Sequence, residues 1–493
     1  MAKSTSIKRN FVMNALLTMS TFIFPLITFP YVSRILGPLG TGKVSLATSV
    51  VSYFTMFAQL GIPTYGIRSC AKVRDNKEEL TRTSHELLMI NMITTAISFV
   101  SFIIALIFIP RLREERTLYI IVSLNIILSS LGMEWLYKAL EQYTYITVRS
   151  IIFKFISFIG MFLLIHSEKD YVIYGGLTIF AGCASNVLNL INVRKYIYIK
   201  SVGNYNLKRH IKAVWVFFAM ACATTIYTHL DTVMLGFMKT DEDVGFYNAA
   251  VKIKSILVSV VTSLGTVLLP RASYYIKNNM IDEFHRITNK ALNFVFLLAS
   301  PLLVYFMIFA KQGILFLSGN DYLNAVFPMQ IIMPTLLLIG ITNILGIQIL
   351  VPLGREKIVL YSEIAGAVVD LVLNAILIPL MASSGAAIGT LVAEIVVLIV
   401  QVIALNTEVK EAFRKVSYLR IVIGLLLAGL VSFWTKLLPL YTYFNTTMAS
   451  FLMILISGCL FFLMYGIVML ITKEPLVAEI TGQLVAKLKR RQK

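Results

Sequence analysis

Residues 11–33 read FVMNALLTMSTFIFPLITFPYVS, an apolar run without a charged side chain. A helix of about 20 apolar residues crosses the hydrocarbon core of a bilayer, so this run predicts a membrane-spanning helix. The run is too long for a removable signal peptide, and it lacks the small-residue cleavage site. Lipid is therefore the expected surrounding of this part of the chain.

Further runs of the same kind follow along the whole chain. They lie near residues 44–66, 86–109, 117–137, 145–165, 171–193, 211–236, 245–269, 290–317, 327–350, 358–380, 385–405, 417–438 and 449–471. Of the 493 residues, 58% are hydrophobic and 14% are charged, whereas about a quarter are charged in a soluble domain. We therefore expect an all-α integral membrane protein with about fourteen transmembrane helices.

The formal net charge of +19 is explained by the loops between these runs. If the N-terminus lies in the cytoplasm, about 32 of the 44 Lys and Arg residues fall on the inner side and about 9 on the outer side. Cytoplasmic loops carry this excess, so both termini are expected inside, with a basic tail at Lys487–Arg491. Because the charges alternate with apolar runs, they do not indicate nucleic-acid binding.

Patterns typical of catalysis or metal binding are not found. The four cysteines, Cys70, Cys183, Cys222 and Cys459, lie far apart and show no zinc-ligand spacing. The segment from Gly37 to Lys43 fits the first part of a P-loop, but Val44 stands where Ser or Thr would bind magnesium. We expect no enzyme, no cofactor and no metal.

An internal repeat relates the first and seventh spans. Arg34–Gly37 followed by Gly42–Ala47 resembles Val233–Gly236 followed by Gly245–Ala250. Each half holds an even number of spans, so the halves have the same orientation, as in some secondary transporters. We expect an N-lobe at 1–202, a C-lobe at 203–408, and two further spans with the tail at 409–493. The substrate site of such a fold lies between the lobes.

Polar residues recur at helical spacing in the first two spans of each half. These stripes predict a hydrated face, and close packing of helices through Ser and Thr is the alternative. The stripes include Asn14, Thr18, Thr21 and Thr28, then Thr48, Ser52 and Thr55, then Thr224, Thr228 and Asp231, and then Lys252, Ser255, Ser259 and Thr262.

Ionisable residues inside spans are costly in lipid and usually face a cavity or a partner. Glu363 and Asp370 are seven residues apart and share a helix face, with Asn374 one turn further. We expect a gate or a proton- or sodium-responsive site there, and a plain structural ion pair is the alternative. The acids predicted for ion coupling or gating are Glu134, Asp231, Glu363, Asp370 and Glu394.

Several passages together resemble a known family over essentially the whole chain. They are Pro25–Pro38, Trp135–Arg149, Leu230–Gly236 with Val244–Lys252, and Leu345–Glu356. They are similar to the polysaccharide-transporter, Wzx-type, flippases of the multidrug/oligosaccharidyl-lipid/polysaccharide exporter superfamily. The resemblance implies two six-helix lobes around a central cavity, with two extra helices. It also implies export of undecaprenyl-pyrophosphate-linked oligosaccharide for O-antigen, capsule or exopolysaccharide across the bacterial inner membrane by alternating access.

The resemblance further implies that cationic cavity residues meet the pyrophosphate. A pyrophosphate needs several cations to leave water, while its lipid tail can stay in the bilayer. Here that role would fall to Arg34, Arg68, Arg149, Lys154, Lys252, Lys254 and Arg271. The expected protein partners are a polysaccharide polymerase and glycosyltransferases.

Two other classes of function stay open. The first is an exporter of the same fold for a peptidoglycan or teichoic precursor or a drug. The second is a membrane-bound polymerase or ligase, which usually needs a sizeable outer loop with catalytic groups. The short outer loops argue against the second alternative.

Overall fold

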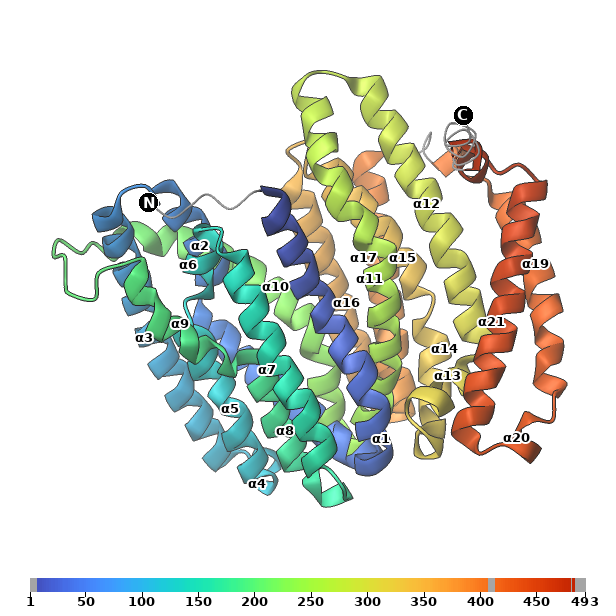
Figure 1. Cartoon of the computed structure of the whole chain (residues 1–493), viewed down its shortest axis with the longest axis horizontal. Coiled ribbons are helices and arrows are strands. Elements are labelled where there is room, and N and C mark those ends of the chain that lie inside the picture. Colours follow the sequence, from blue (N-terminus) through green and yellow to red (C-terminus); the bar gives the residue numbers. More distant parts are fainter. Residues whose placement is uncertain (1–6, 407–412, 480, 484–493) are drawn as a thin grey trace, which may run out of the picture. The chain divides into compact units, whose positions relative to one another are not determined.

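The computed structural model describes residues 7–406, 413–479 and 481–483, and the elements in these ranges are helices and turns (Figure 1). A backbone in lipid finds no water to bond, and helices satisfy its polar groups internally. By its contacts the chain divides into unit 1, residues 1–245, and unit 2, residues 246–493. The basic tail predicted at Lys487–Arg491 lies outside the described residues.

Unit 1 contains ten α-helices and the start of an eleventh within the described residues. They are α1 (Ile7–Gln59), α2 (Ile62–Lys72), α3 (Lys77–Phe108), α4 (Pro110–Glu114), α5 (Arg116–Leu131), α6 (Glu134–Ala139), α7 (Tyr143–Leu164), α8 (Tyr171–Ile179), α9 (Asn186–Asn192), α10 (Lys208–Met238) and α11 (Asp241–Lys277).

Unit 2 begins inside α11 and continues through the C-terminal helices. They are α12 (Ile281–Ile308), α13 (Ala310–Leu317), α14 (Val326–Ile332), α15 (Thr335–Asn343), α16 (Glu356–Met381), α17 (Ser383–Leu405), α19 (Tyr418–Phe433), α20 (Leu440–Tyr443) and α21 (Thr446–Ile471). A π-helical turn, Ile344–Leu350, follows α15.

The helix α1 contains two spans that meet at Gly37. Gly37 has φ 63° and ψ −178°, a conformation outside the helical region that glycine adopts without a Cβ clash. Glu141 accepts hydrogen bonds from Asn10 Nδ2 (3.4 Å) and Arg74 Nη1 (2.8 Å). Because the start of α1 and the segment just after α2 both reach Glu141, the chain reverses between them, and Gly37 is where it turns.

The number of spans agrees with the hydropathy of the sequence. Twelve helices of the described chain are long and apolar enough to cross a membrane, or up to thirteen with one bent pair. One of them, Val12–Lys72, is 61 residues long and includes the break at Gly37. A single crossing needs only about 20 residues, so this element supplies two spans. Counted that way, the spans match the fourteen runs in the sequence.

Two spans differ from their apolar runs for local reasons. The third span begins at Lys77, before the apolar run at 86–109, because the Asn76 side chain caps the backbone N–H groups of Glu78 and Glu79. The span within Asn320–Leu350 is bent by 43° between Ile332 and Thr335. Pro334 lies in that gap, and a proline removes a helical hydrogen bond and clashes with the preceding turn.

Candidate functional site

A buried arginine forms the centre of a charged cluster in unit 1. Arg149 lies on α7 with 3% of its side chain exposed. Its Nη2 lies 3.4 Å from Glu134 Oε2, and its Nη1 donates to Asn186 Oδ1 at 3.0 Å. The amide nitrogen of Asn186 donates to the Leu128 carbonyl, which turns Oδ1 toward the guanidinium.

The charges in this cluster do not balance. Lys138 Nζ lies 2.8 Å from Glu134 Oε1, so one carboxylate is shared by two cations. Arg149 Nε has no hydrogen-bond partner among the described residues, although it is buried. An excess positive charge is costly away from water, and an incoming anion would offset that cost. We define Glu134, Lys138, Arg149 and Asn186 as the Arg149 cluster.

A second cation of α7 faces the first span. Lys154 Nζ donates to Ser20 Oγ at 2.8 Å, and Thr147 Oγ1 donates to the Met13 carbonyl at 2.9 Å. These contacts pack α7 along the first half of α1. Arg149 and Lys154 are five residues apart on one helix, so α7 places two of the predicted cations in the same membrane-spanning segment.

The polar stripe of α1 lies on another side of that helix. Thr18 and Thr21 are exposed, and their hydroxyls donate to the carbonyls of Asn14 and Thr18. Thr224 and Thr228 on α10 are also exposed and bond carbonyls of their own helix. A hydroxyl that donates to a carbonyl of its own helix can face either a neighbouring helix or water. These stripes are therefore compatible with close helix packing and with a hydrated face.

In unit 2 a seam of polar and small residues joins α16 and α17. A Cβ at Gly385 would lie 2.4 Å from the Leu377 carbonyl, so the two backbones approach closely there. Gln401 Nε2 donates to Ser362 Oγ at 3.2 Å at the other end of the seam. The buried polar residues along it are Ser362, Asp370, Asn374, Thr390, Glu394 and Gln401.

The middle of the seam brings oxygen atoms together around Gly389. A Cβ added there would lie 2.4 Å from Asn374 Oδ1 and 2.9 Å from Asp370 Oδ1. On the next residue, Thr390 Oγ1 lies 3.0 Å from the hydroxyl of Tyr247 on α11. Oxygen atoms of this kind suit a hard cation or a proton. We define Asp370, Asn374, Gly389 and Thr390 as the acidic seam.

Replacing Gly389 by alanine is expected to disturb the acidic seam. The added methyl group must displace the carboxyl and amide oxygens, and overpacking of this kind costs about 1–3 kcal/mol. Thermal unfolding of the purified protein measures that loss. Gly466→Ala is the matched control, because a Cβ there meets no atom within 4 Å. Equal melting temperatures for the two variants would contradict the predicted crowding.

A fully buried carboxylate holds the start of α10 against α2 and α3. Glu86 on α3 accepts from the Asn206 backbone N–H at 2.6 Å, from His210 Nε2 at 2.7 Å and from Arg209 Nε at 2.8 Å. Tyr65 Oη lies 2.8 Å from His210 Nδ1. A hydroxyl that donates to Nδ1 leaves Nε2 to carry the proton toward Glu86. This Glu86 network joins α2, α3 and α10.

The other end of α10 is held by glycine contacts and an ion pair. Arg111 Nη2 lies 2.6 Å from Asp241 Oδ1, and its Nε donates to the Gly236 carbonyl at 3.1 Å. A Cβ at Gly42 would overlap the Asp241 carbonyl, and one at Gly245 would overlap the Pro38 carbonyl. Gly42 and Gly245 are matched by the sequence repeat, so equivalent helix starts of the two halves meet here.

The other predicted site residues lie elsewhere on the two units. Arg34 is partly buried and donates to the Pro30 carbonyl of its own helix, and Asp231 is buried on α10. Glu363 is partly buried on α16. The remaining predicted cations are Arg68 and Arg271, which are exposed, and Lys252 and Lys254, which are partly buried on α11.

Some residues of these clusters were not predicted. Lys138 lies four residues after Glu134, a spacing that signals a helical ion pair. No comparable short spacing marks Asn186, Glu86 or Gly389, because their partners lie on other helices.

Comparisons with known proteins give relatives over most of the chain. The family profile described as "Polysaccharide biosynthesis protein" matches residues 7–276, and the profile "MatE" matches residues 217–376. A protein of Escherichia coli K12 named "Putative O-antigen transporter" is 24% identical over 394 residues, which are 80% of this chain and 95% of that protein. A protein of the same name from Shigella dysenteriae is 25% identical over 403 residues, covering 80% of this chain and 98% of that protein.

A solved structure shares the fold. The structure titled "Lipid II flippase MurJ, inward closed conformation" matches with a TM-score of 0.71 and 16% identity, over 93% of this chain and 99% of that chain. At this identity the likeness establishes the all-α fold.

Proposed function

Because the chain belongs to the family described as polysaccharide biosynthesis protein, we propose that it is a flippase that translocates an undecaprenyl-pyrophosphate-linked oligosaccharide repeat unit. The unit would serve the synthesis of O-antigen, capsule or exopolysaccharide. The names of the relatives from Escherichia coli and Shigella dysenteriae support a transporter of O-antigen precursors. The chain is a multi-pass membrane protein, and we place it in the bacterial cytoplasmic membrane with both termini inside.

The observation that carries this proposal is the unbalanced charge of the Arg149 cluster. A carboxylate shared by Arg149 and Lys138 leaves positive charge within a membrane protein, with a buried N–H of Arg149 unsatisfied. A pyrophosphate supplies the missing acceptors, and hydrogen bonds between ionised groups are about twice as strong as neutral ones. The polyprenyl tail stays in lipid, so only the polar head requires a hydrated path.

The other predicted cations are proposed to extend that path. We assign Arg34, Arg68, Lys154, Lys252, Lys254 and Arg271 to contacts with the pyrophosphate or with acidic sugars. Among these residues, Lys154 lies on the same helix as Arg149, and its Nζ donates to Ser20 Oγ on α1. The N-lobe at 1–202 and the C-lobe at 203–408 would enclose the path, with 409–493 outside it.

We propose that the acidic seam couples transport to a proton or sodium gradient, with Glu134, Asp231, Glu363 and Glu394 as further candidates. Asp370→Asn keeps the shape of the side chain and removes its charge. Transport by this variant is expected to lose its dependence on the gradient, measured by imposing and collapsing each ion gradient across vesicles. A gradient dependence like that of the wild type would remove Asp370 from the coupling site.

Deletion of the protein in its host tests the proposed activity. The lipid-linked unit is expected to accumulate on the cytoplasmic leaflet, where externally added glycosidases do not reach it. Expression of the intact chain should restore polymer at the cell surface. Normal surface polymer in the deletion strain, in a host with no second transporter, would contradict the proposal.

A further inference from the structure

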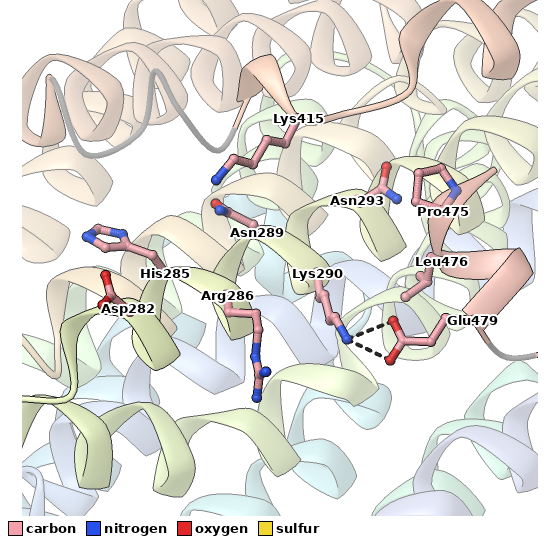
Figure 2. A pocket seen from close by; sticks show the side chains of 10 residues that line it. All are labelled: Asp282, His285, Arg286, Asn289, Lys290, Asn293, Lys415, Pro475, Leu476 and Glu479. Carbon is pink, nitrogen blue, oxygen red and sulfur yellow. Dashed lines mark hydrogen bonds and ion pairs between the residues drawn. The ribbon is translucent and has the colours of Figure 1, made fainter. Parts of the chain in front are cut away.

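A polar cleft of about 380 Å³ opens at the end of unit 2 where α12 begins and α21 ends (Figure 2). Its lining comes from the first turns of α12, the segment before α19 and the segment after α21. The neighbouring Met280 and Ile281 are exposed and apolar, 39% and 47%. A polar cleft at the end of a 28-residue span is expected at the level of the lipid headgroups, outside the hydrocarbon core.

The floor of the cleft carries a buried acceptor without a donor. Asn293 is 7% exposed, and its Nδ2 donates to Glu474 Oε1 at 2.6 Å. A carboxylate only accepts, so this contact fixes which end of the amide is nitrogen. The buried Glu474 also accepts from the Val477 backbone N–H at 2.9 Å, which holds it in place. Asn293 Oδ1 has no hydrogen-bond partner among the described residues.

The rim of the cleft carries three cations and two carboxylates, Asp282 and Glu479. Two of its cations are paired, Lys290 with Glu479 at 2.7 Å and Arg286 with Glu283 at 2.6 Å. Lys415 is exposed and makes no ion pair with any residue that the structure describes. Figure 2 shows Lys415 extending from the segment before α19 toward the side chains of α12, among them Asn289. The cleft thus offers an unpaired cation, an amide and a buried acceptor, with the Asp282 carboxylate on the same rim.

We propose that this cleft binds a phosphodiester headgroup whose terminal group donates a hydrogen bond, the phosphoglycerol or phosphoethanolamine head of a bilayer lipid. The phosphate meets Lys415 and Asn289, and the terminal hydroxyl or ammonium donates to Asn293 Oδ1. A choline headgroup has the same phosphate but no donor, so it leaves that oxygen unpaired. Basic pockets at the cytoplasmic ends of spans are common places for such headgroups. The site uses no residue of the Arg149 cluster.

Binding of defined lipids to the full chain in detergent tests this site. Native mass spectrometry would compare phosphatidylglycerol, phosphatidylethanolamine and phosphatidylcholine with identical acyl chains. The first two are expected to bind about tenfold more tightly than the third, as one hydrogen bond at a buried acceptor accounts for about a factor of ten. Equal binding of all three lipids would overturn the assignment of Asn293.

Two variants and a soluble ligand separate the remaining explanations. Lys415→Gln is expected to weaken both favoured lipids by about tenfold. Lys277→Gln is the matched control, because Lys277 is exposed at the end of α11 and does not line the cleft. Equal losses in both variants would indicate unspecific attraction and overturn the site. Glycerophosphoglycerol without acyl chains should bind far more weakly, and equal affinity would make a free phosphodiester the ligand. None of these outcomes depends on transport.

Discussion

Glu86→Ala is expected to lower the free energy of unfolding by about 3–5 kcal/mol, the usual cost of removing one partner from a buried charged network. The substitution leaves His210, which is 5% exposed, and the Asn206 backbone N–H without their acceptor. It also removes the ion pair of Arg209 with α3 and leaves its hydrogen bond to Thr83 at 3.3 Å. Thermal unfolding of the purified protein should show a drop of several degrees in melting temperature.

Glu78→Ala is the matched control for this experiment. Glu78 lies on the same helix, is 61% exposed and pairs with Arg82, one turn away. Exposed pairs of this kind contribute about 0–1 kcal/mol, so this variant should unfold close to the wild-type temperature. A Glu86→Ala protein as stable as Glu78→Ala would show that the Glu86 network does not hold α10 in place.

Arg149→Gln is expected to reduce transport roughly a hundredfold, because truncating a buried charged partner costs about 2–5 kcal/mol. Glutamine can keep the contact with Asn186 but supplies no charge to a pyrophosphate. The rate is measured as the initial flux of lipid-linked oligosaccharide in vesicles. Arg74→Gln is the control, since Arg74 makes an exposed pair with Glu141. Its transport should stay within a factor of about two of the wild type.

A double variant distinguishes substrate binding from a purely structural role of Arg149. In Arg149→Gln/Glu134→Gln both partners of the ion pair, the buried Arg149 and the partly exposed Glu134, are neutral, so the lost stability should return. If Arg149 binds the pyrophosphate, transport stays low even though the melting temperature recovers. Recovery of both quantities together would identify the Arg149 cluster as a structural ion pair.

The spans could be predicted from the sequence because composition alone decides whether a segment enters lipid. Local bends could also be traced to single residues, such as Gly37 and Pro334. The apolar run at 86–109 does not reach the start of α3 at Lys77, because the first turn of this helix is polar and hydropathy does not report a cap such as Asn76. Composition therefore predicts which segments cross the membrane, and it predicts the first residue of each helix less well.

The clusters could be predicted only in part. Arg149 and Glu134 stood out as charges inside apolar runs, but their pairing depends on the turn at Met133, which has φ 44°. Glu86 did not stand out, because it lies at the edge of an apolar run and its partners follow about 120 residues later. Long-range partners of this kind are set by helix packing, which the order of residues does not reveal.

The central claim is that the chain moves a lipid-linked oligosaccharide between leaflets, and reconstituted vesicles test it most directly. A fluorescent undecaprenyl-pyrophosphate oligosaccharide is incorporated in both leaflets, and an impermeant glycosidase then digests whatever reaches the outer surface. With the wild-type protein the inner pool should become accessible and be digested, whereas vesicles with Arg149→Gln or without protein should retain it. An inner pool that stays protected in the presence of active, folded wild-type protein under every ion gradient would contradict the account.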